Sequence, residues 1–172
     1  MMTPRLLVRP MAVADADAYH RVRGMMPFDP QERSLDESRA LVAGMVTRQE
    51  ADAEGWQQFA ILRREDGAYV GDIGVNFDTP RAQQAEMGFA VDEALRGQGL
   101  AAEAAGAVLA QLFASGRHRV TALTDIRNIP TQRLLERLGF RREAHFKSSW
   151  WHQGAWHDEV AYGLLASEFK AG

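Results

Sequence analysis

The chain has 172 residues, of which 46% are hydrophobic and 25% charged, and its formal net charge at pH 7 is −3. This length and composition are typical of one soluble globular domain, so we expect a single domain over residues 1–172. The negative balance argues against a nucleic-acid binder, and the absence of cysteine excludes disulfides, thiolate metal sites and cysteine nucleophiles. Because no run resembles a signal peptide or a membrane span, we expect a cytoplasmic protein without nucleic-acid or membrane partners.

The first third of the chain combines one short strand with two helices. Apolar residues at 6–8 predict the strand, and the pattern over residues 15–23 predicts the first helix. A loop is expected over residues 24–30, where a glycine and two prolines interrupt regular structure. Ser34 and Glu37 have the spacing of a capping box, which places the start of the second helix there.

The middle of the chain changes to the alternating pattern of strands. Three such runs lie at residues 59–62, 69–75 and 85–91. The links at residues 65–68 and 78–81 carry turn-forming residues, so the three strands should be antiparallel neighbours.

The last third alternates helices and strands. Gly116 has the character of a helix C-terminal cap, and residues 119–123 read as a strand. Asn128 is the expected N-cap of a further helix, and two final strands are expected over residues 140–146 and 156–165. The full order predicts an α/β fold with a mixed, mostly antiparallel central sheet flanked by helices.

The most informative segment is residues 95–102, LRGQGLAA, which joins a predicted strand to an alanine-rich helix. Gly97 and Gly99 let the backbone approach a ligand closely, since no Cβ is in the way. The first amides of a helix lack partners within it, and the helix dipole is positive there, so this loop is suited to phosphate or pyrophosphate. Arg96 adds a fixed positive charge. Gly106, inside the helix, costs about 1 kcal/mol relative to alanine, which predicts close packing against the sheet.

The same glycines also satisfy a dinucleotide-binding fingerprint, read as Gly97-x-Gly99-x-x-Ala102. The context disfavours a nicotinamide enzyme, because antiparallel hairpins precede the loop. Only about 70 residues follow it, too few for the rest of a doubly wound sheet.

Arg96-x-x-Gly99-x-Ala101 resembles the acyl-CoA pyrophosphate motif of the GNAT acetyltransferases, Q/R-x-x-G-x-G/A. Four further segments resemble the RimJ/RimL-like branch of that family, the ribosomal-protein-alanine N-acetyltransferase-like proteins. They are residues 3–10 (TPRLLVRP), 86–91 (EMGFAV), 128–140 (NIPTQRLLERLGF) and 154–165 (GAWHDEVAYGLL). The resemblance covers nearly the whole chain and implies a single GNAT-like domain.

The resemblance implies that acetyl-CoA is the acyl donor and that a primary amine is the acceptor. It implies a bulged strand whose backbone lines the pantetheine arm, and Gly88 is where we expect the irregularity. The cofactor-binding residues that follow are Phe89, Ala90, Val91, Arg96, Gly97, Gln98, Gly99, Leu100, Ala101, Asn128 and Thr131. No grouping of side chains has metal-ligand spacing, so no metal is expected.

Glu86 is the candidate catalytic base, since it lies on the same strand as the proposed pantetheine-binding segment. The alternative is a solvated or ion-paired strand glutamate, and His145 and His157 are further candidates. Many family members carry a tyrosine acid at the position of Leu135, so no phenol can protonate the leaving thiolate here; a thiol pKa near 8.5 allows departure without one.

The identity of the amine acceptor stays open. The branch resemblance favours a protein N-terminal α-amine, while a polyamine, amino acid or aminoglycoside is the alternative, as is an acyl-CoA-binding sensor without turnover. The tryptophans at 150, 151 and 156 either shape an acceptor pocket or pack in the core, and the loop at residues 25–28 (MMPF) suits a substrate rim. A homodimer is also left open.

Overall fold

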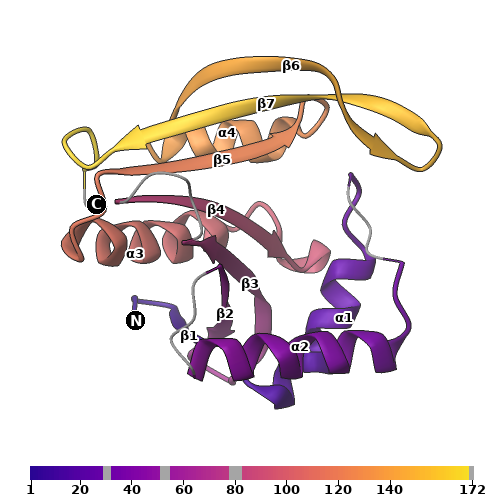
Figure 1. Ribbon diagram of the computed structural model, residues 1–172. Coiled ribbons are helices and arrows are strands. Elements are labelled where there is room, and N and C mark those ends of the chain that lie inside the picture. The colour runs from indigo at the N-terminus through magenta and orange to yellow at the C-terminus, as the bar shows by residue number, and fades with distance from the viewer. Residues whose placement is uncertain (29–31, 51–54, 78–82, 171–172) are drawn as a thin grey trace.

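The computed structural model describes residues 1–28, 32–50, 55–77 and 83–170 (Figure 1). Within them, a seven-stranded sheet has the order β1-β2-β3-β4-β5-β7-β6. The strands are β1 (Leu6–Pro10), β2 (Trp56–Arg63), β3 (Tyr69–Asn76), β4 (Gln84–Val91), β5 (Arg119–Asp125), β6 (Arg141–His152) and β7 (Ala155–Leu165). Neighbouring strands are antiparallel except β4 and β5, which are parallel. The predicted mixed, mostly antiparallel sheet is confirmed.

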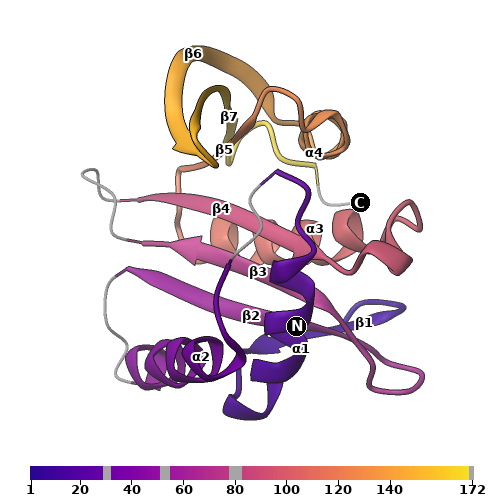
Figure 2. The same ribbon diagram turned by 90° about the vertical axis from the view of Figure 1, so that its right-hand side faces the viewer.

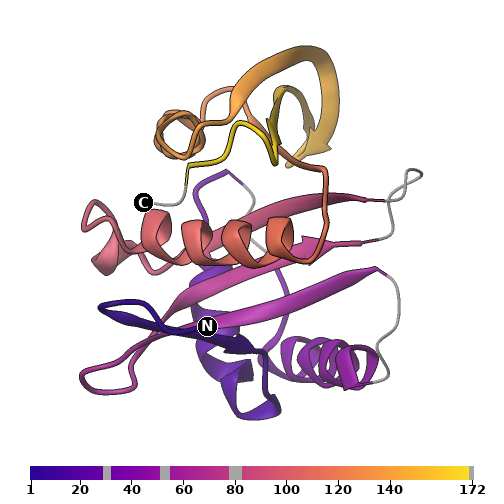
Figure 3. The ribbon, with the colours of Figure 1, turned by 90° about the vertical axis from the view of Figure 1, so that its left-hand side faces the viewer.

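Helices cover both faces of this sheet. They are α1 (Ala16–Gly24), α2 (Leu35–Glu50), α3 (Leu100–Ala114) and α4 (Ile129–Arg137), with 3-10 turns at Val13–Asp15 and Glu93–Leu95. Figures 2 and 3 view the molecule from opposite sides, and α1 stands before the central strands in one view and α3 in the other. Among the described helices, none combines the length and the apolar character that crossing a membrane requires.

The helix ends follow the local signals in the sequence. Ser34 and Glu37 form the predicted capping box, with the Ser34 amide 2.7 Å from a Glu37 carboxylate oxygen and the Glu37 amide 3.2 Å from the Ser34 hydroxyl. Beyond α3, the Arg117 amide donates to the Leu112 carbonyl at 3.1 Å, and Gly116 supplies the left-handed turn, as predicted. The first helix begins at Ala16, after a 3-10 turn.

The main core lies between the central strands and α3. It includes fully buried Ile73, Met87, Leu109 and Leu135. The expectation of close packing at Gly106 is wrong, because a Cβ placed there would meet no heavy atom within 4 Å. Ala104 and Ala105 are fully buried in the core, whereas Gly106 is half-buried and faces open space.

The parallel strands β4 and β5 pair only at their beginnings. The pairs are Gln84 with Arg119, Ala85 with Val120 and Glu86 with Thr121, while β4 continues to Val91 and β5 to Asp125. The predicted bulge at Gly88 is wrong, since Gly88 pairs with Gly74 in a register that β3 and β4 keep over all six of their pairs. The opening in the sheet arises instead from the divergence of β4 and β5 after Glu86.

The last two strands form a longer hairpin than predicted, which runs along the top of Figure 1. Its far end carries the three tryptophans, with 41% of Trp150, 55% of Trp151 and 59% of Trp156 exposed, so packing of these rings in the core is contradicted. The predicted turn at residues 78–81 and the end of the predicted loop at residues 29–30 lie outside the described residues.

Candidate active site

The glycine loop between β4 and α3 has the conformation that its glycines permit. Gly97 has a φ of +75° and Gly99 a φ of +78°, values that residues with a Cβ rarely adopt. Gly99 is the N-cap residue of α3, and glycine offers no side chain to satisfy the first helical amides. These amides therefore stay available to an anion at the positive end of the helix dipole.

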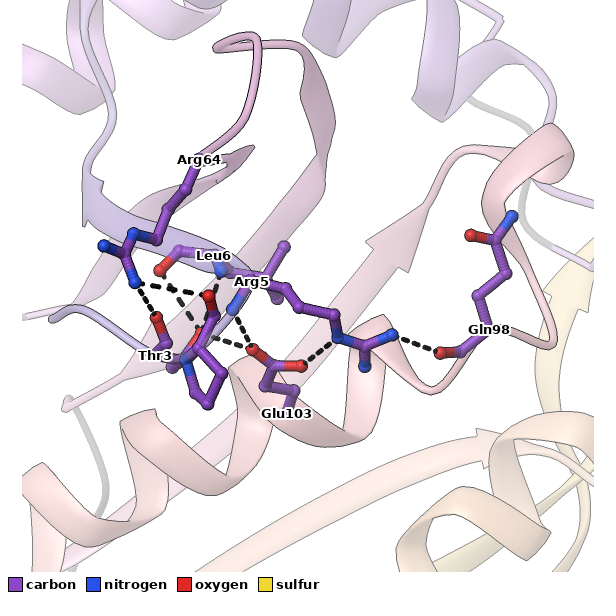
Figure 4. A network of polar contacts seen from close by, with 7 residues as sticks. Thr3, Arg5, Leu6, Arg64, Gln98 and Glu103 are labelled. Carbon is purple, nitrogen blue, oxygen red and sulfur yellow. Dashed lines mark hydrogen bonds and ion pairs between the residues drawn. The ribbon is translucent and has the colours of Figure 1, made fainter.

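The start of the chain braces this loop, as Figure 4 shows. The Arg5 guanidinium extends along the first turn of α3, 3.0 Å from the Gln98 carbonyl oxygen and 2.6 Å from a Glu103 carboxylate oxygen. The Arg5 amide and the Thr3 hydroxyl donate to the other Glu103 oxygen at 2.9 and 2.5 Å. Sequence reasoning missed this support, because the contacts join residues about a hundred positions apart.

A cavity of about 410 Å³ lies against the glycine loop. Nine of the predicted cofactor-binding residues line it: Phe89, Val91, Arg96, Gly97, Gly99, Leu100, Ala101, Asn128 and Thr131. Ala90 and Gln98 do not. Ala90 is buried, and the Gln98 carbonyl accepts the hydrogen bond from Arg5. Arg133 and Arg137 of α4 also line this cavity, although their pattern in the sequence is that of a solvated helix face.

A second cavity of about 380 Å³ holds carboxylates. Glu86, Asp125 and Glu159 line it, together with Arg23 and aromatic rings that include Trp56. The residues common to both cavities are Met26, Phe28, Phe89, Asn128 and Thr131. The cavities thus adjoin where β4 and β5 diverge, with the anion-binding loop on one side and the carboxylates on the other.

Glu86 lies at this junction. It is the last β4 residue to pair with β5 and is half-buried, opposite Asn76 of β3. Asp125 is less suited to accept a proton, because hydrogen bonds and charge from Arg127 hold its pKa below the usual range. The alternatives His145 and His157 line neither cavity. The His145 ring nitrogen lies 2.6 Å from an Asp158 carboxylate oxygen on the last hairpin.

Asn128 and Leu135 mark the α4 side of the junction. The Asn128 side-chain oxygen accepts the Thr131 amide at 3.3 Å, so the predicted N-cap is confirmed. Leu135 is fully buried and borders the second cavity, so a hydrocarbon side chain occupies this position. Of the three tryptophans of the last hairpin, Trp150 borders this cavity, whereas Trp151 and Trp156 border neither cavity.

A sheet that opens between two parallel strands, with a phosphate-suited loop on one side and a carboxylate-lined cavity on the other, fits a group-transfer enzyme with a phosphate-bearing donor. The sequence model of the acetyltransferase (GNAT) domain matches residues 5–141, and the chain belongs to this family. It is an acetyl-CoA-dependent N-acetyltransferase, and the resemblance seen in its motifs is confirmed.

Individual relatives match over almost their full lengths. The uncharacterized N-acetyltransferase YnaD of Bacillus subtilis (strain 168) is 28% identical over 172 residues, which cover 98% of each chain. The crystal structure of a GNAT-family acetyltransferase from Bacillus anthracis superimposes with a TM-score of 0.81 at 26% identity, over 98% of this chain and 99% of that one. Mycobacterium smegmatis RimJ in complex with CoA-disulfide gives 0.80 at 25% identity, over 95% and 83%.

Proposed function

We propose that the protein moves the acetyl group of acetyl-CoA to a primary amine, and that the amine is a protein N-terminal α-amine. The observation that carries this proposal is the junction of the two cavities at the divergence of β4 and β5. A donor on the loop side and an amine on the carboxylate side can meet at this junction. Holding both reactants in one geometry is a large part of catalysis for an already activated thioester.

The donor side fits an acyl-CoA. The free amides around Gly97 and Gly99 and the charge of Arg96 suit the pyrophosphate, and Arg133 and Arg137 add positive charge to the same cavity. Phe89 and Val91 supply an apolar wall for the pantetheine arm. The proposed contacts further comprise Leu100, Ala101, Asn128 and Thr131, with the backbone of Ala90 and Gln98 as part of the same two segments.

The acceptor side fits an amine. We assign to Glu86 the role of proton acceptor, directly or through a water molecule, so that the neutral amine nitrogen attacks the thioester carbonyl carbon. The new C–N bond forms as the C–S bond breaks, and the sulfur leaves as a thiolate that solvent protonates. The carboxylates of Asp125 and Glu159 add a negative field that draws an ammonium group into the cavity.

The test is release of free CoA thiol across α-amine peptides, polyamines, amino acids and aminoglycosides, with a thermal shift measured beside it. Acetyl-CoA should raise the melting temperature and NAD should not, because a ligand that binds only the folded state stabilises it. The highest kcat/KM should fall on a peptide. Stabilisation by acetyl-CoA without turnover of any amine would instead make the protein a sensor, and preference for a polyamine would replace the acceptor class.

A further inference from the structure

Arg23 is a partly buried arginine in the wall of the acceptor cavity. Its side chain is 17% exposed and is ion-paired with Asp72, whose side chain is fully buried. Asp72 also accepts hydrogen bonds from the Gln58 amide and from the Tyr69 hydroxyl, the latter at 3.3 Å. The Arg23 Nε is buried without a hydrogen-bond partner, and the guanidinium carbon lies 5.5 Å from the centre of the Tyr19 ring. The cation is held rigidly while part of its donor capacity stays unused.

A buried ion pair is a weak source of stability, since removing two charges from water costs about as much as their attraction returns. Because stability does not account for this pair, its place at a cavity wall indicates a role in binding. The guanidinium is planar, permanently charged and suited to a second carboxylate, and a rigid anchor lowers the entropy lost on binding one.

The positions that hold this cation and Glu86 lie along the same two strands. Asp72, which anchors the guanidinium, pairs with Ala90 of β4, and Glu86 lies four residues before Ala90 on that strand. At the usual rise of a strand, Glu86 and Ala90 are therefore about 13 Å apart along β4. Gly88 lies between them, borders the cavity, and would meet no heavy atom within 4 Å if it carried a Cβ.

We propose that the acceptor is dipolar: its amine lies next to Glu86, and a carboxylate on the second residue of the peptide binds Arg23. The inference rests on the proposed acetyl transfer to a peptide N-terminus and deepens it. Asp125 and Glu159 line the same cavity and repel an anion, so the Arg23 end is where a substrate carboxylate is accepted. The preferred substrates are therefore peptides with an acidic residue beside the reacting amine.

Three peptides that differ only at the second residue test this: Ala-Asp, Ala-Asn and Ala-Lys, each followed by the same neutral sequence. The Asp peptide should exceed the Asn peptide in kcat/KM by about ten- to a hundredfold, the range of a hydrogen bond between charged groups, and the Lys peptide should be poorest. The difference should lie in KM, because the contact exists in both the ground state and the transition state.

The paired variant Arg23→Gln with Asp72→Asn removes both charges of the buried pair together. It should bring the ratio of kcat/KM for the Asp peptide to kcat/KM for the Asn peptide close to one. Arg23→Lys, which keeps the charge, should retain part of the preference. Arg39→Gln is the matched control, since Arg39 pairs with Asp17 on the exposed surface and borders neither cavity.

Equal kcat/KM for the three peptides, or preference for the Lys peptide, would overturn the dipolar acceptor and leave acetyl transfer standing. An unchanged Asp-to-Asn ratio in the folded paired variant would overturn the role of Arg23. If circular dichroism shows that the paired variant does not fold, Arg23→Lys takes its place. An Asp-to-Asn ratio of kcat/KM below that of the native protein would support the role of Arg23, and an equal ratio would overturn it. Failure to acetylate any of the three peptides would overturn both proposals.

Discussion

Arg5 and Glu103 join the segment just before β1 to the first turn of α3 across 98 positions of sequence, through the Arg5 guanidinium and its backbone amide. A carboxylate in the first turn is favourable to the helix dipole but would repel a phosphate bound at the same end. Arg5 offsets this charge and also holds the Gln98 carbonyl oxygen at 3.0 Å. The pair thus supports the glycine loop in the shape that its proposed ligand requires.

The first prediction concerns acid stability. Burial raises the pKa of Glu103, but hydrogen bonds from Thr3 and Arg5 outweigh it and hold this pKa below the usual 4.5. A lowered pKa contributes stability above the unfolded value and loses it as the pH falls through the folded value. Glu103→Gln should therefore lower the free energy of unfolding by about 1 to 2 kcal/mol at pH 7. Urea titrations should show this gap narrowing below pH 4.5; a constant gap would mean that the carboxylate charge is irrelevant.

The second prediction concerns the donor loop. Gly99→Glu should abolish acetyl-CoA binding in calorimetry, through steric block and repulsion of the pyrophosphate, while the fold is retained. Gly116→Glu is the matched control, because Gly116 has a comparable φ of +88° at the opposite end of α3. Both variants store similar backbone strain, of about 1 to 3 kcal/mol. Micromolar affinity in folded Gly99→Glu would exclude the loop as the binding site.

The features that the sequence predicted correctly depend on neighbours within one turn. The capping box of Ser34 and Glu37 and the N-cap at Asn128 each close through contacts three residues apart. The glycine loop is predictable for the same reason, since positive φ is a local property of Gly97 and Gly99. Contacts between residues a few positions apart depend on local spacing, so they can be predicted without knowledge of the fold.

The features that were missed or wrong depend on long-range packing. Arg5 with Glu103 and Arg23 with Asp72 are separated by 98 and 49 positions, and periodicity carries no signal for such pairs. The bulge expected at Gly88 follows from a tendency of glycine in strands, whereas the opening is created by strands that diverge after Glu86. The sequence pattern therefore predicted where the sheet opens but not how the opening forms.

The third prediction concerns Gly106, where the structure leaves room for a methyl group. Gly106→Ala should stabilise the protein by about 0.5 to 1 kcal/mol, the propensity difference between these residues in a helix. Gly71→Ala is the opposite case, because its Cβ would lie 2.1 Å from the Ala90 carbonyl oxygen. Thermal melts should move up for the first variant and down for the second. A lower melting temperature for Gly106→Ala would restore the close-packing interpretation.

The fourth prediction concerns Leu135. Because it is fully buried, Leu135→Ala should cost about 2 to 5 kcal/mol of stability through lost burial and a new cavity. Leu123 also borders the acceptor cavity but is 45% exposed, so Leu123→Ala should cost less. Activity of Leu135→Ala should follow the folded fraction measured by urea titration. A large loss of kcat per folded molecule would contradict a packing role.

The last prediction concerns Glu86 as the base. Glu86→Gln keeps the size and hydrogen bonding of the side chain but accepts no proton, so kcat should fall by about 10² to 10⁴ with acetyl-CoA affinity nearly unchanged. Glu159→Gln removes a charge from the same cavity and should mainly raise KM for the amine.

The pH profile separates the roles open to Glu86. The loss of kcat in Glu86→Gln should shrink toward high pH, where an α-amine with a pKa of about 8 is already neutral and needs no base. A loss that is independent of pH would make Glu86 a residue that orients the amine. An unaltered kcat from pH 6 to 9 would mean that solvent removes the proton, and that the carboxylate at the junction contributes only to the charge of the cavity.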